Sequence, residues 1–395
     1  YYHNLYDKNR INLSKCKFED LPLISSSDLI LHNELFCSSS EPIFRISSSS
    51  GTSKHPKSLY RTIGDYETSV ELMTTLLLES GLSNKDKVYI GQPFDLATFG
   101  YLVLDGCKKI GALAIPGGLG QSNERMLDLI FQYNANVIMS SPSRIKVLSE
   151  LVDMLYSSYE RERLISNIDK IILAGEPLCT HDKIRLMKFW KCEILNYYGS
   201  EETDSLGYSA AKSEDIVLLR NGFYFEFIPV NSEVFELVVT SLYHRGTPLI
   251  RYRLGDLIKY IGRENNCHKI QIIGKSVDVV NLFDGVKLYA YQVEDLIKHY
   301  VKNYINFQII CQRKENYDYV KVLIKTSDQN RIYSDIEREL ENKVWDCSLD
   351  LNVCKEIGSV RFDFLINKED YQITRRGKVP RVIDLREEQS SCIKQ

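Results

Sequence analysis

KIILAGEPLCTHDKIRLMKFWKCEILNYYGSEE, residues 170–202, decides the fold class. Two short apolar runs, KIIL and EIL, flank a segment whose apolar residues recur at helical spacing. A strand, a helix and a second strand in this order form a βαβ unit with parallel strands. Ligands bind beyond the carboxyl ends of such strands, where AGEP (174–177) and YYGSEE (197–202) stand. The stretch therefore predicts a parallel sheet with a ligand site at one edge.

The same alternation continues toward the N-terminus. From residue 64 onward, helical segments such as DYETSVELMTTLLLESGL (65–82) precede strand-like runs such as KVYIGQP (87–93). Residues 220–262 are instead rich in short β-like runs, which predicts a hairpin-rich subdomain. The expected fold is α/β, with a large, mostly parallel N-terminal domain, a β-rich subdomain and a helical, irregular lead-in at residues 1–45.

The C-terminal part reads as a small α+β lid domain. A chain of 395 residues exceeds what one core usually fills, which is about 250–300 residues, so two domains are expected. We place the boundary in GKSVDVVNLFDG, at about residues 274–278, which gives domains 1–274 and 275–395. The expected elements are helices at YQVEDLIKHYV (291–301) and SDIERELENKVW (334–345), and strands at NFQIICQR (306–313), YVKVLIKT (319–326) and LNVCKEI (351–357).

Composition excludes several classes of protein. The net charge of −3, with lysines and acids interspersed, gives no reason to expect nucleic acid or an anionic membrane as a partner. No apolar run approaches the roughly 20 residues of a membrane helix, and the polar N-terminus does not read as a signal peptide. The ten cysteines form no CxxC pair, so reduced thiols and a cytoplasmic location are expected.

Hydroxyl side chains surround one glycine in SSSSGTSKHPK, residues 47–57. Hydroxyls donate hydrogen bonds, glycine lets backbone N–H groups approach phosphate oxygens, and lysine adds a mobile positive charge. This favours a loop that holds the outer phosphates of a triphosphate, although GxxxxGK[ST] is absent; the alternative is a flexible polar loop. The candidate ligands are Ser49, Ser50, Gly51, Thr52, Ser53 and Lys57.

The two turns of the opening stretch carry further candidates. An adenine could lie along the tight turn of AGEP, although an ordinary βα turn has the same sequence features. In NYYGSEE, a tyrosine ring suits adenine stacking, and carboxylate oxygens suit Mg²⁺ bound to phosphates; the alternative is an exposed acidic turn. The residues singled out are Gly175, Glu176 and Pro177 in the first turn and Tyr197, Tyr198, Gly199, Glu201 and Glu202 in the second.

Two charged residues complete the pattern. Asp256, in RYRLGDLIKY (251–260), could accept hydrogen bonds from both ribose hydroxyls, or it could belong to a plain hairpin turn. Lys378, in RRGKVPR (375–381), follows a glycine and could reach a carboxylate that attacks an α-phosphate. In a water-poor site such a contact is worth several kcal/mol, about 3 or more. The alternative is a solvated basic tail.

In this order, the motifs resemble the adenylate-forming superfamily of acyl-CoA synthetases, adenylation domains and luciferases. Within it, the chain is most similar to the phenylacetate–CoA ligase branch. PLIRYRLGD (248–256) resembles the branch's Arg-Tyr-Arg segment, and residues 274–294 resemble its interdomain hinge. GKVPRVIDLR (377–386) is similar to the closing lysine motif, and LPLISSSDL (21–29) fits the lead-in. The resemblance covers nearly the whole chain.

The resemblance implies an enzyme that uses ATP and Mg²⁺ to convert a carboxylic acid, aryl or arylacetic, into an acyl-AMP with release of pyrophosphate. It implies Lys378 and Glu202 as catalytic residues, Glu202 as the metal ligand, Lys275 as a further nucleotide ligand, and a lid that rotates about residues 274–278. The aromatic stretch PFDLATFGY would line the acid pocket, although it also fits core packing. The implied pocket residues are Phe94, Phe99, Tyr101, Gly117, Gly118 and Tyr197.

Four departures from the family pattern leave alternatives open. Lys54 replaces a loop glycine, Glu201 a threonine or serine, Lys275 an arginine, and Val277 an aspartate or lysine. A relative that binds nucleotide without turnover is therefore an alternative to an active ligase. CoA is the expected acceptor, with a carrier-protein thiol or an amine as alternatives. Residues 206–225 contain neither Cys nor His, so the zinc site of some relatives is not expected.

Overall fold

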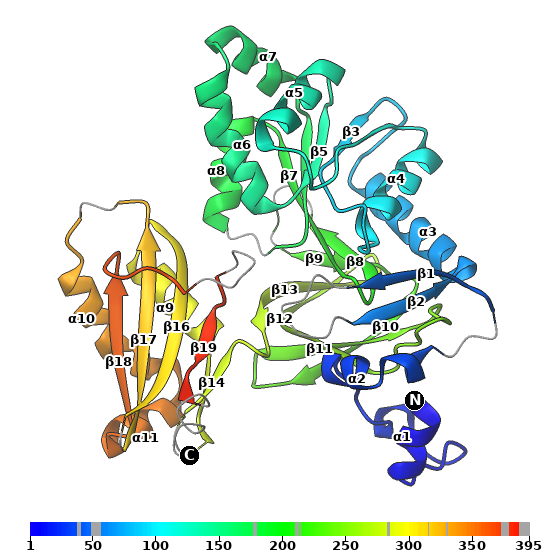
Figure 1. Ribbon diagram of the computed structural model, residues 1–395. Helices are drawn as coiled ribbons and strands as arrows, with labels where there is room; N and C mark the ends of the chain where they lie inside the picture. The colour runs from blue at the N-terminus through cyan, green and yellow to red at the C-terminus, as the bar shows by residue number, and fades with distance from the viewer. Residues whose placement is uncertain are drawn as a thin grey trace, which may run out of the picture. The chain divides into compact units, whose positions relative to one another are not determined.

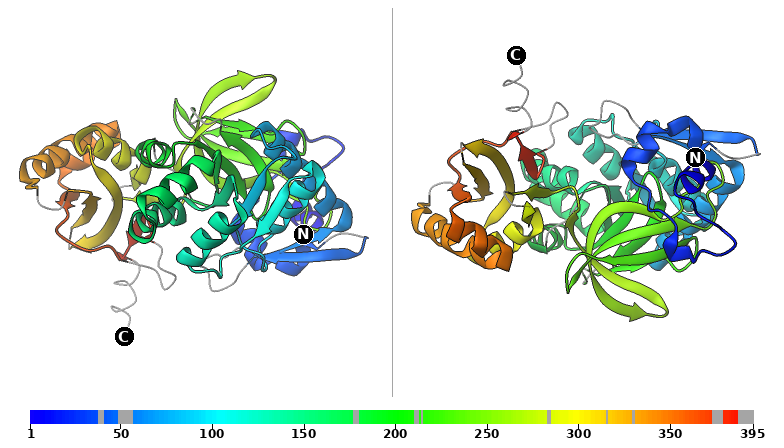
Figure 2. Two further views of the ribbon diagram at one scale, coloured as in Figure 1. Left: turned by 90° about the horizontal axis from the view of Figure 1, so that it is seen from above. Right: turned by 90° about the horizontal axis from the view of Figure 1, so that it is seen from below.

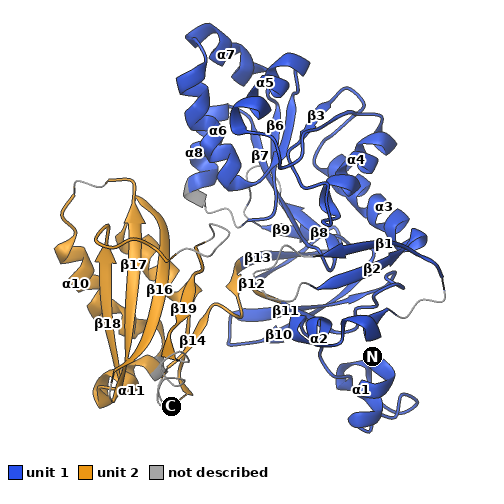
Figure 3. Cartoon of the chain, in the orientation of Figure 1, with its two compact units in different colours: residues 1–254, 258–272 blue, residues 255–257, 273–395 orange. Residues whose placement is uncertain are grey.

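The computed structural model divides the chain into two compact units (Figure 3). Unit 1 comprises residues 1–254 and 258–272, and unit 2 comprises residues 255–257 and 273–395. The structure describes residues 1–37, 41–48, 57–176, 180–209, 213, 215–282, 285–314, 316–328, 331–372 and 379–386.

An eleven-stranded sheet, in the order β10-β11-β12-β13-β9-β8-β7-β6-β5-β3-β4, forms the centre of unit 1. Its β4-β3-β5-β6-β7 part is parallel throughout, as the βαβ pattern predicts. The strands of this part are β3 (Lys87–Ile90), β4 (Leu113–Pro116), β5 (Val137–Ser140), β6 (Lys170–Leu173) and β7 (Glu193–Ser200).

Helices cover both faces of the parallel part (Figures 1 and 2). Val88 and Ile90 of β3 pack into the core beside α3 and α4, whereas Tyr89 between them packs into the core beside α5–α8. Burial on both faces explains why these strands are continuous apolar runs instead of alternating ones. The helices are α3 (Ile63–Glu79), α4 (Phe99–Ile110), α5 (Asn123–Tyr133), α6 (Pro142–Leu155), α7 (Ser158–Asn167) and α8 (Thr180–Trp190).

The other part of the sheet is largely antiparallel and contains the expected β-rich region. Strand β7 turns back into β8, β8 pairs with β9, and β9 pairs with β13, each antiparallel. The α/β fold with a β-rich region is thereby confirmed. The strands are β8 (Asp204–Ser209), β9 (Ile216–Leu218), β10 (Phe223–Pro229), β11 (Val234–Ser241), β12 (Tyr252–Glu264) and β13 (Cys267–Lys275).

The lead-in packs onto the start of β12. The backbone N–H of Ile24 donates to Arg251 O (3.1 Å), and that of Arg253 donates to Ile24 O (2.8 Å), so a short parallel bridge forms there. The Arg251 guanidinium also contacts the carbonyls of Glu19 and Leu21. The elements of this region are α1 (Tyr2–Lys8), η1 (Phe18–Asp20), α2 (Ser26–Leu31), η2 (Asn33–Phe36) and the hairpin β1 (Ile43–Ser48)–β2 (Ser58–Thr62).

Unit 2 has a four-stranded sheet in the order β18-β17-β16-β19, with one face covered by helices (Figure 2). The expected strand at residues 351–357 is wrong: these residues belong to a helix that Ser348 caps at its start and Gly358, with φ 73°, ends. The elements are β14 (Val279–Asn281), β15 (Lys287–Tyr289), α9 (Ala290–Tyr300), β16 (Tyr304–Lys314), β17 (Tyr317–Thr326), α10 (Ser334–Lys343), η4 (Val344–Cys347), α11 (Leu349–Ile357), β18 (Val360–Ile366) and β19 (Val382–Asp384).

Within the described ranges, none of the helices combines the length and the apolar character needed to cross a membrane. The cytoplasmic location stays a prediction.

Candidate functional site

Lys57 and Glu202 form an ion pair in unit 1, although 145 residues separate them along the chain. Lys57 directly precedes β2, and Glu202 follows the end of β7 in the turn that leads to β8. Only 6% of Glu202 is exposed, so the exposed acidic turn considered as an alternative is wrong. A lysine predicted to hold a phosphate and a glutamate predicted to hold Mg²⁺ thus lie together, beyond the carboxyl ends of the parallel strands.

Glu202 is held in its ionised form. The Tyr252 hydroxyl donates to Glu202 Oε1 at 2.8 Å, and the Lys57 ammonium contacts the same oxygen. Burial alone would raise the pKa of Glu202, but the charge of Lys57 and these hydrogen bonds hold it below its usual range. The site therefore presents a fixed carboxylate, which is the chemistry that Mg²⁺ binds.

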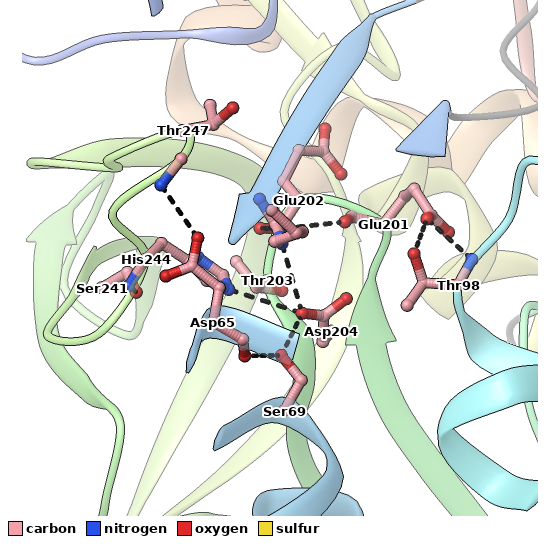
Figure 4. Close-up of polar contacts among 12 residues, drawn as sticks. Asp65, Ser69, Thr98, Glu201, Glu202, Thr203, Asp204, Ser241, His244 and Thr247 are labelled. Atoms are coloured by element: carbon pink, nitrogen blue, oxygen red, sulfur yellow. Dashed lines mark hydrogen bonds and ion pairs between the residues drawn. The ribbon is translucent and has the colours of Figure 1, made fainter. Parts of the chain in front are cut away.

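A buried polar network fixes the turn that carries Glu202 (Figure 4). The Arg61 guanidinium, 1% exposed, donates to Glu202 O at 2.7 Å and lies 3.6 Å from the Asp204 carboxylate. Asp204 accepts a hydrogen bond from Ser69 (2.7 Å) and lies 3.4 Å from His244 Nε2. Burial, assisted by the Arg61 charge, lowers the pKa of His244 to about 4. His244 is therefore neutral at pH 7 and acts as a polar part of the core.

Asp65 joins α3 to the loop before β12. Its carboxylate accepts the backbone N–H groups of Arg245 and Gly246 at 2.8 Å each, and it also accepts the Thr62 N–H in the capping box of α3. A Cβ on Gly246 would lie 2.4 Å from Tyr60 O, so only glycine fits where this loop crosses β2. These contacts fix β2, and with it Arg61 and Lys57, against the rest of unit 1.

Glu201 is bound to Thr98, the residue directly before α4 (Figure 4). Its Oε1 accepts the Thr98 backbone N–H (2.9 Å) and the Thr98 hydroxyl (2.7 Å). Burial and the nearby charge of Asp204 raise the pKa of Glu201 to about 7 from an ordinary 4.5. The glutamate that replaces the family hydroxyl therefore lies at the N-terminus of α4 and changes charge near neutral pH.

Replacing Glu201 by glutamine is expected to stabilise the protein selectively at high pH. Since the folded-state pKa is raised, the folded protein keeps a proton that the unfolded chain loses between pH 4.5 and 7. This lowers the stability of the wild type by roughly 3 kcal/mol as pH rises through that window. The glutamine side chain still accepts the hydrogen bonds from Thr98. The free energy of unfolding of Glu201→Gln, measured in urea, should therefore exceed that of the wild type at pH 8 and be close to the wild-type value at pH 5.

The control for this prediction is Glu150→Gln, which changes an exposed glutamate of α6. The free energy of unfolding of Glu150→Gln should differ from that of the wild type by the same amount at pH 5 and at pH 8. A pH-independent difference for Glu201→Gln as well would contradict the assignment of a raised pKa to Glu201.

The predicted acid-pocket stretch is held by β1. The Arg45 guanidinium donates to Ala97 O at 2.8 Å and lies 4.2 Å from the Tyr101 ring centroid. Tyr101 donates to Phe94 O at 2.6 Å, and the Phe99 ring lies 4.4 Å from the Tyr197 ring. Phe94 and Phe99 also pack against the large core of unit 1, so core packing accounts for part of the pattern. Their role in acid binding stays a prediction.

The glycines of the predicted pocket follow β4. The backbone N–H groups of Gly117 and Gly118 donate to Ile90 O at 3.1 and 3.0 Å. A Cβ on Gly117 would lie 2.0 Å from the Tyr89 hydroxyl, which leaves no space for a side chain there. The close approach of backbone and ring explains the glycine, and its role toward the acid stays a prediction.

In the AGEP turn, Gly175 and Glu176 lie at the carboxyl end of β6. Gly175 has φ 85°, a left-handed value that favours glycine. The Glu176 carboxylate accepts from the Ser143 hydroxyl (2.8 Å) and backbone N–H (3.1 Å), so it joins this turn to the first turn of α6. The adenine contacts predicted for these residues stay predictions.

The tyrosines of NYYGSEE lie within β7, which ends at Ser200. Tyr197 and Tyr198 are 7% and 8% exposed, and Tyr197 donates to Asp204 O at 2.8 Å. A Cβ on Gly199 would lie 1.9 Å from Asp204 O, so β7 and β8 approach closely there. Adenine stacking on either ring stays a prediction.

In unit 2, Asp256 is paired with Lys275. Their side chains lie 2.5 Å apart, and Asp256 is 4% exposed. Burial raises the pKa of the nearby Asp278, against the opposing charges of Arg381 and Lys275. Two predicted nucleotide ligands, Asp256 and Lys275, are thus brought together at the predicted hinge. Their contacts with ribose stay predictions.

Several predicted residues lie outside the described residues, namely Ser49, Ser50, Gly51, Thr52, Ser53, Pro177 and Lys378. The site also contains residues that sequence reasoning did not single out, namely Arg61, Thr98 and Tyr252. Tyr252 stands in the Arg-Tyr-Arg segment, so that motif was a usable signal. Arg61 and Thr98 act through contacts with residues more than 100 positions away, which spacing does not reveal.

Comparison with known proteins supports the resemblance to this branch. A phenylacetate–CoA ligase of Pseudomonas putida is 25% identical over 321 residues, which cover 78% of this chain and 71% of the ligase. A phenylacetate–CoA ligase of Thermus thermophilus is 24% identical over 421 aligned positions, which cover 98% of this chain and 92% of the ligase. The chain resembles the phenylacetate–CoA ligases. The expected enzyme class, a phenylacetate–CoA ligase-like acid–thiol ligase, is confirmed as a class by these relatives.

The fold of this ligase-like chain also has solved counterparts. A 2-hydroxyisobutyryl-CoA ligase in complex with 2-HIB-AMP matches with a TM-score of 0.73 at 17% identity, covering 100% of this chain and 87% of that one. At this identity the likeness supports the fold alone. No protein-family model matches the chain.

Proposed function

We propose that the protein activates a carboxylic acid with ATP and transfers the acyl group to CoA. In the first step a carboxylate oxygen bonds to the α-phosphorus of ATP, the bond from that phosphorus to the β-phosphate bridge breaks, and pyrophosphate leaves. In the second step the CoA sulfur bonds to the acyl carbon, its proton goes to solvent, and AMP leaves. The pair of Lys57 and Glu202 at the edge of the parallel sheet is the observation that carries this proposal.

The chemistry requires that two anions approach each other. Like charges about 4 Å apart repel by roughly 4 kcal/mol at an effective dielectric constant of 20. Glu202, a buried and ionised carboxylate, would hold a Mg²⁺ ion, and that ion would supply positive charge there. When ATP is bound, Lys57 pairs with a phosphate oxygen instead of Glu202. The hydrogen bond from Tyr252 keeps Glu202 in place. The ion pair is thus a preformed nucleotide site, in which a phosphate is the ligand for Lys57 and a metal ion is the ligand for Glu202.

Other roles follow from the resemblance. Asp256 binds the ribose, Lys275 and the hydroxyl-rich loop at residues 49–53 bind the nucleotide, and Lys378 neutralises the attacking carboxylate. Unit 2 acts as a lid that turns about residues 274–278 between the two steps. An aryl or arylacetic acid is supported by the aromatic stretch at residues 94–101, where rings of Phe94 and Tyr101 lie 5.3 Å apart. The names of the relatives support CoA as acceptor.

The test is acid-dependent pyrophosphate release with panels of aryl, arylacetic, fatty and amino acids. We expect release with aryl or arylacetic acids, and acyl-CoA on adding CoA. Hydroxylamine, candidate amines and a carrier-protein thiol, added in place of CoA, test the alternative acceptors. Thermal stabilisation by ATP without pyrophosphate release from any acid would overturn the proposal and favour a protein that binds nucleotide without turnover.

A further inference from the structure

A groove with a volume of about 360 Å³ lies on the β-rich part of the sheet in unit 1. Its lining residues come from β9 and the loop after it, from β10, and from the adjoining ends of β12 and β13 (Figure 1). None of them belongs to the network around Lys57 and Glu202. The groove is therefore a candidate site of its own, and it does not depend on the proposed function.

Aromatic side chains form one wall of this groove. Phe223, Phe225 and Phe227 alternate along β10, so their rings lie on one face of that strand. The Phe227 ring centroid lies 5.0 Å from that of His268 on β13 and 5.0 Å from that of Tyr260 on β12. Since β11 and β12 separate β10 from β13 in the sheet order, the sheet must curve to bring these rings together. The wall is flat-sided and apolar, which suits contact with another aromatic ring.

His268 belongs to this wall as a neutral ring. Its Nδ1 lies 3.2 Å from the Tyr260 hydroxyl. Burial lowers the pKa of His268, and the positive charge of Arg263 lowers it further. An imidazole with a lowered pKa is uncharged at pH 7, so His268 adds flat surface and no charge. The positive charge in the groove must therefore come from other side chains.

Two arginines, Arg220 and Arg263, supply that charge, since both line the groove. Among the described residues, neither guanidinium has an ion-pair or hydrogen-bond partner. Glu226 and Glu264, which lie nearby along the chain, are each paired with another basic residue, at 2.9 and 3.0 Å. The lining contains neither Asp nor Glu. The groove thus combines uncompensated positive charge with an aromatic wall.

We propose that this groove binds a small molecule that carries an anionic group on a flat aromatic ring. A guanidinium binds carboxylate and phosphate oxygens through paired hydrogen bonds, and the rings of β10 and β13 provide the apolar contact. The volume lies within the range of small-molecule sites, about 300–1,000 Å³. Because an exposed ion pair alone contributes little to affinity, binding requires the ring and the charge together.

The experiment is equilibrium dialysis of the full chain against 2-naphthoate, which is quantified by its own fluorescence. Arg220→Gln, Arg263→Gln and the double variant remove charge, and Arg185→Gln, at an exposed arginine of α8, is the matched control. Each single variant should raise the Kd of the groove at least about threefold and the double variant at least about tenfold, whereas the control should not change it. Equal binding by the wild type and the double variant would overturn the proposal.

Cys267 reports where the probe binds, because this half-buried cysteine lines the groove. Mass spectrometry follows its alkylation by iodoacetamide beside that of the exposed Cys37. At ten times its Kd, 2-naphthoate should slow the alkylation of Cys267 at least about fivefold and leave that of Cys37 unchanged. Acetate, which lacks the ring, and 2-naphthylmethanol, which lacks the charge, should give no protection at the same concentration. Equal protection by either compound would overturn the requirement for both features.

The dialysis separates this groove from the proposed active site. An active site that also binds 2-naphthoate is unchanged in the double variant, so the difference between the double variant and the wild type reports the groove alone. If no acid causes pyrophosphate release, the proposed function fails and the result for the groove stands. If the double variant binds 2-naphthoate as the wild type does, the groove fails as a site and the proposed function stands.

Discussion

Lys378→Ala should reduce acid-dependent ATP–pyrophosphate exchange by at least about 100-fold, because the attacking carboxylate loses the positive charge that offsets its repulsion from the phosphate. Such a contact is worth several kcal/mol in a site without water, and every 1.4 kcal/mol corresponds to tenfold in rate. The same variant should still convert a supplied acyl-adenylate to acyl-CoA, since that step contains no encounter between a carboxylate and a phosphate. Both reactions are measured on one preparation.

The control for Lys378→Ala is Lys302→Ala, which removes an exposed lysine elsewhere in unit 2. It should leave both half-reactions unchanged. Intact pyrophosphate exchange in Lys378→Ala would contradict the role assigned to this lysine. A parallel loss of both half-reactions would instead indicate that the substitution disturbs the fold of unit 2.

Glu202→Gln should have an effect of similar size and a different signature. The variant keeps the shape of the side chain and an acceptor for Tyr252 but loses the charge that binds Mg²⁺. We expect pyrophosphate release to fall at least about 100-fold and the Mg²⁺ concentration needed for half-maximal rate to rise. Lys57, whose side chain is 15% exposed, also loses its partner, so the free energy of unfolding should fall by about 3 kcal/mol. A Mg²⁺ titration and urea unfolding measure the two effects.

Tyr252→Phe provides a graded comparison for Glu202→Gln. It removes one hydrogen bond to Glu202 and leaves the carboxylate and its pairing with Lys57. Its rate should fall by roughly tenfold, because one hydrogen bond to a charged group contributes about 1.5–3 kcal/mol and the lower end of that range corresponds to about tenfold in rate.

An unaltered Mg²⁺ dependence in Glu202→Gln would show that another group binds the metal.

The parallel half of the fold could be predicted from the sequence, because its strands are buried on both faces and its helices are amphipathic. Residues 170–202 form the predicted strand, helix and strand. The strand expected at residues 351–357 is a helix, since the caps at Ser348 and Gly358 outweigh a short apolar pattern. Periodicity over seven residues does not separate the two structures, and the flanking caps were the available signal.

The site was predictable where it depends on single residues and not where it depends on pairing. Glu202 was identified from its motif, yet its partner Lys57 was assigned to phosphate alone, because a contact across 145 residues leaves no mark in local sequence. Glu201 stood out as a departure from the family pattern. Its hydrogen bonds to Thr98, and hence the direction of its pKa, follow only from the three-dimensional arrangement.

The bridge between the lead-in and β12 sets an order of events during synthesis. Arg251 bonds to Leu21 across 230 positions, so the partner of residues 19–24 emerges from the ribosome only after most of unit 1 has been made. At about 5–20 residues per second this takes roughly 10–50 s. During that time the early segment must stay unpaired and available. Nascent chains should therefore acquire protease resistance around Ile24 late, only once residue 253 has left the exit tunnel.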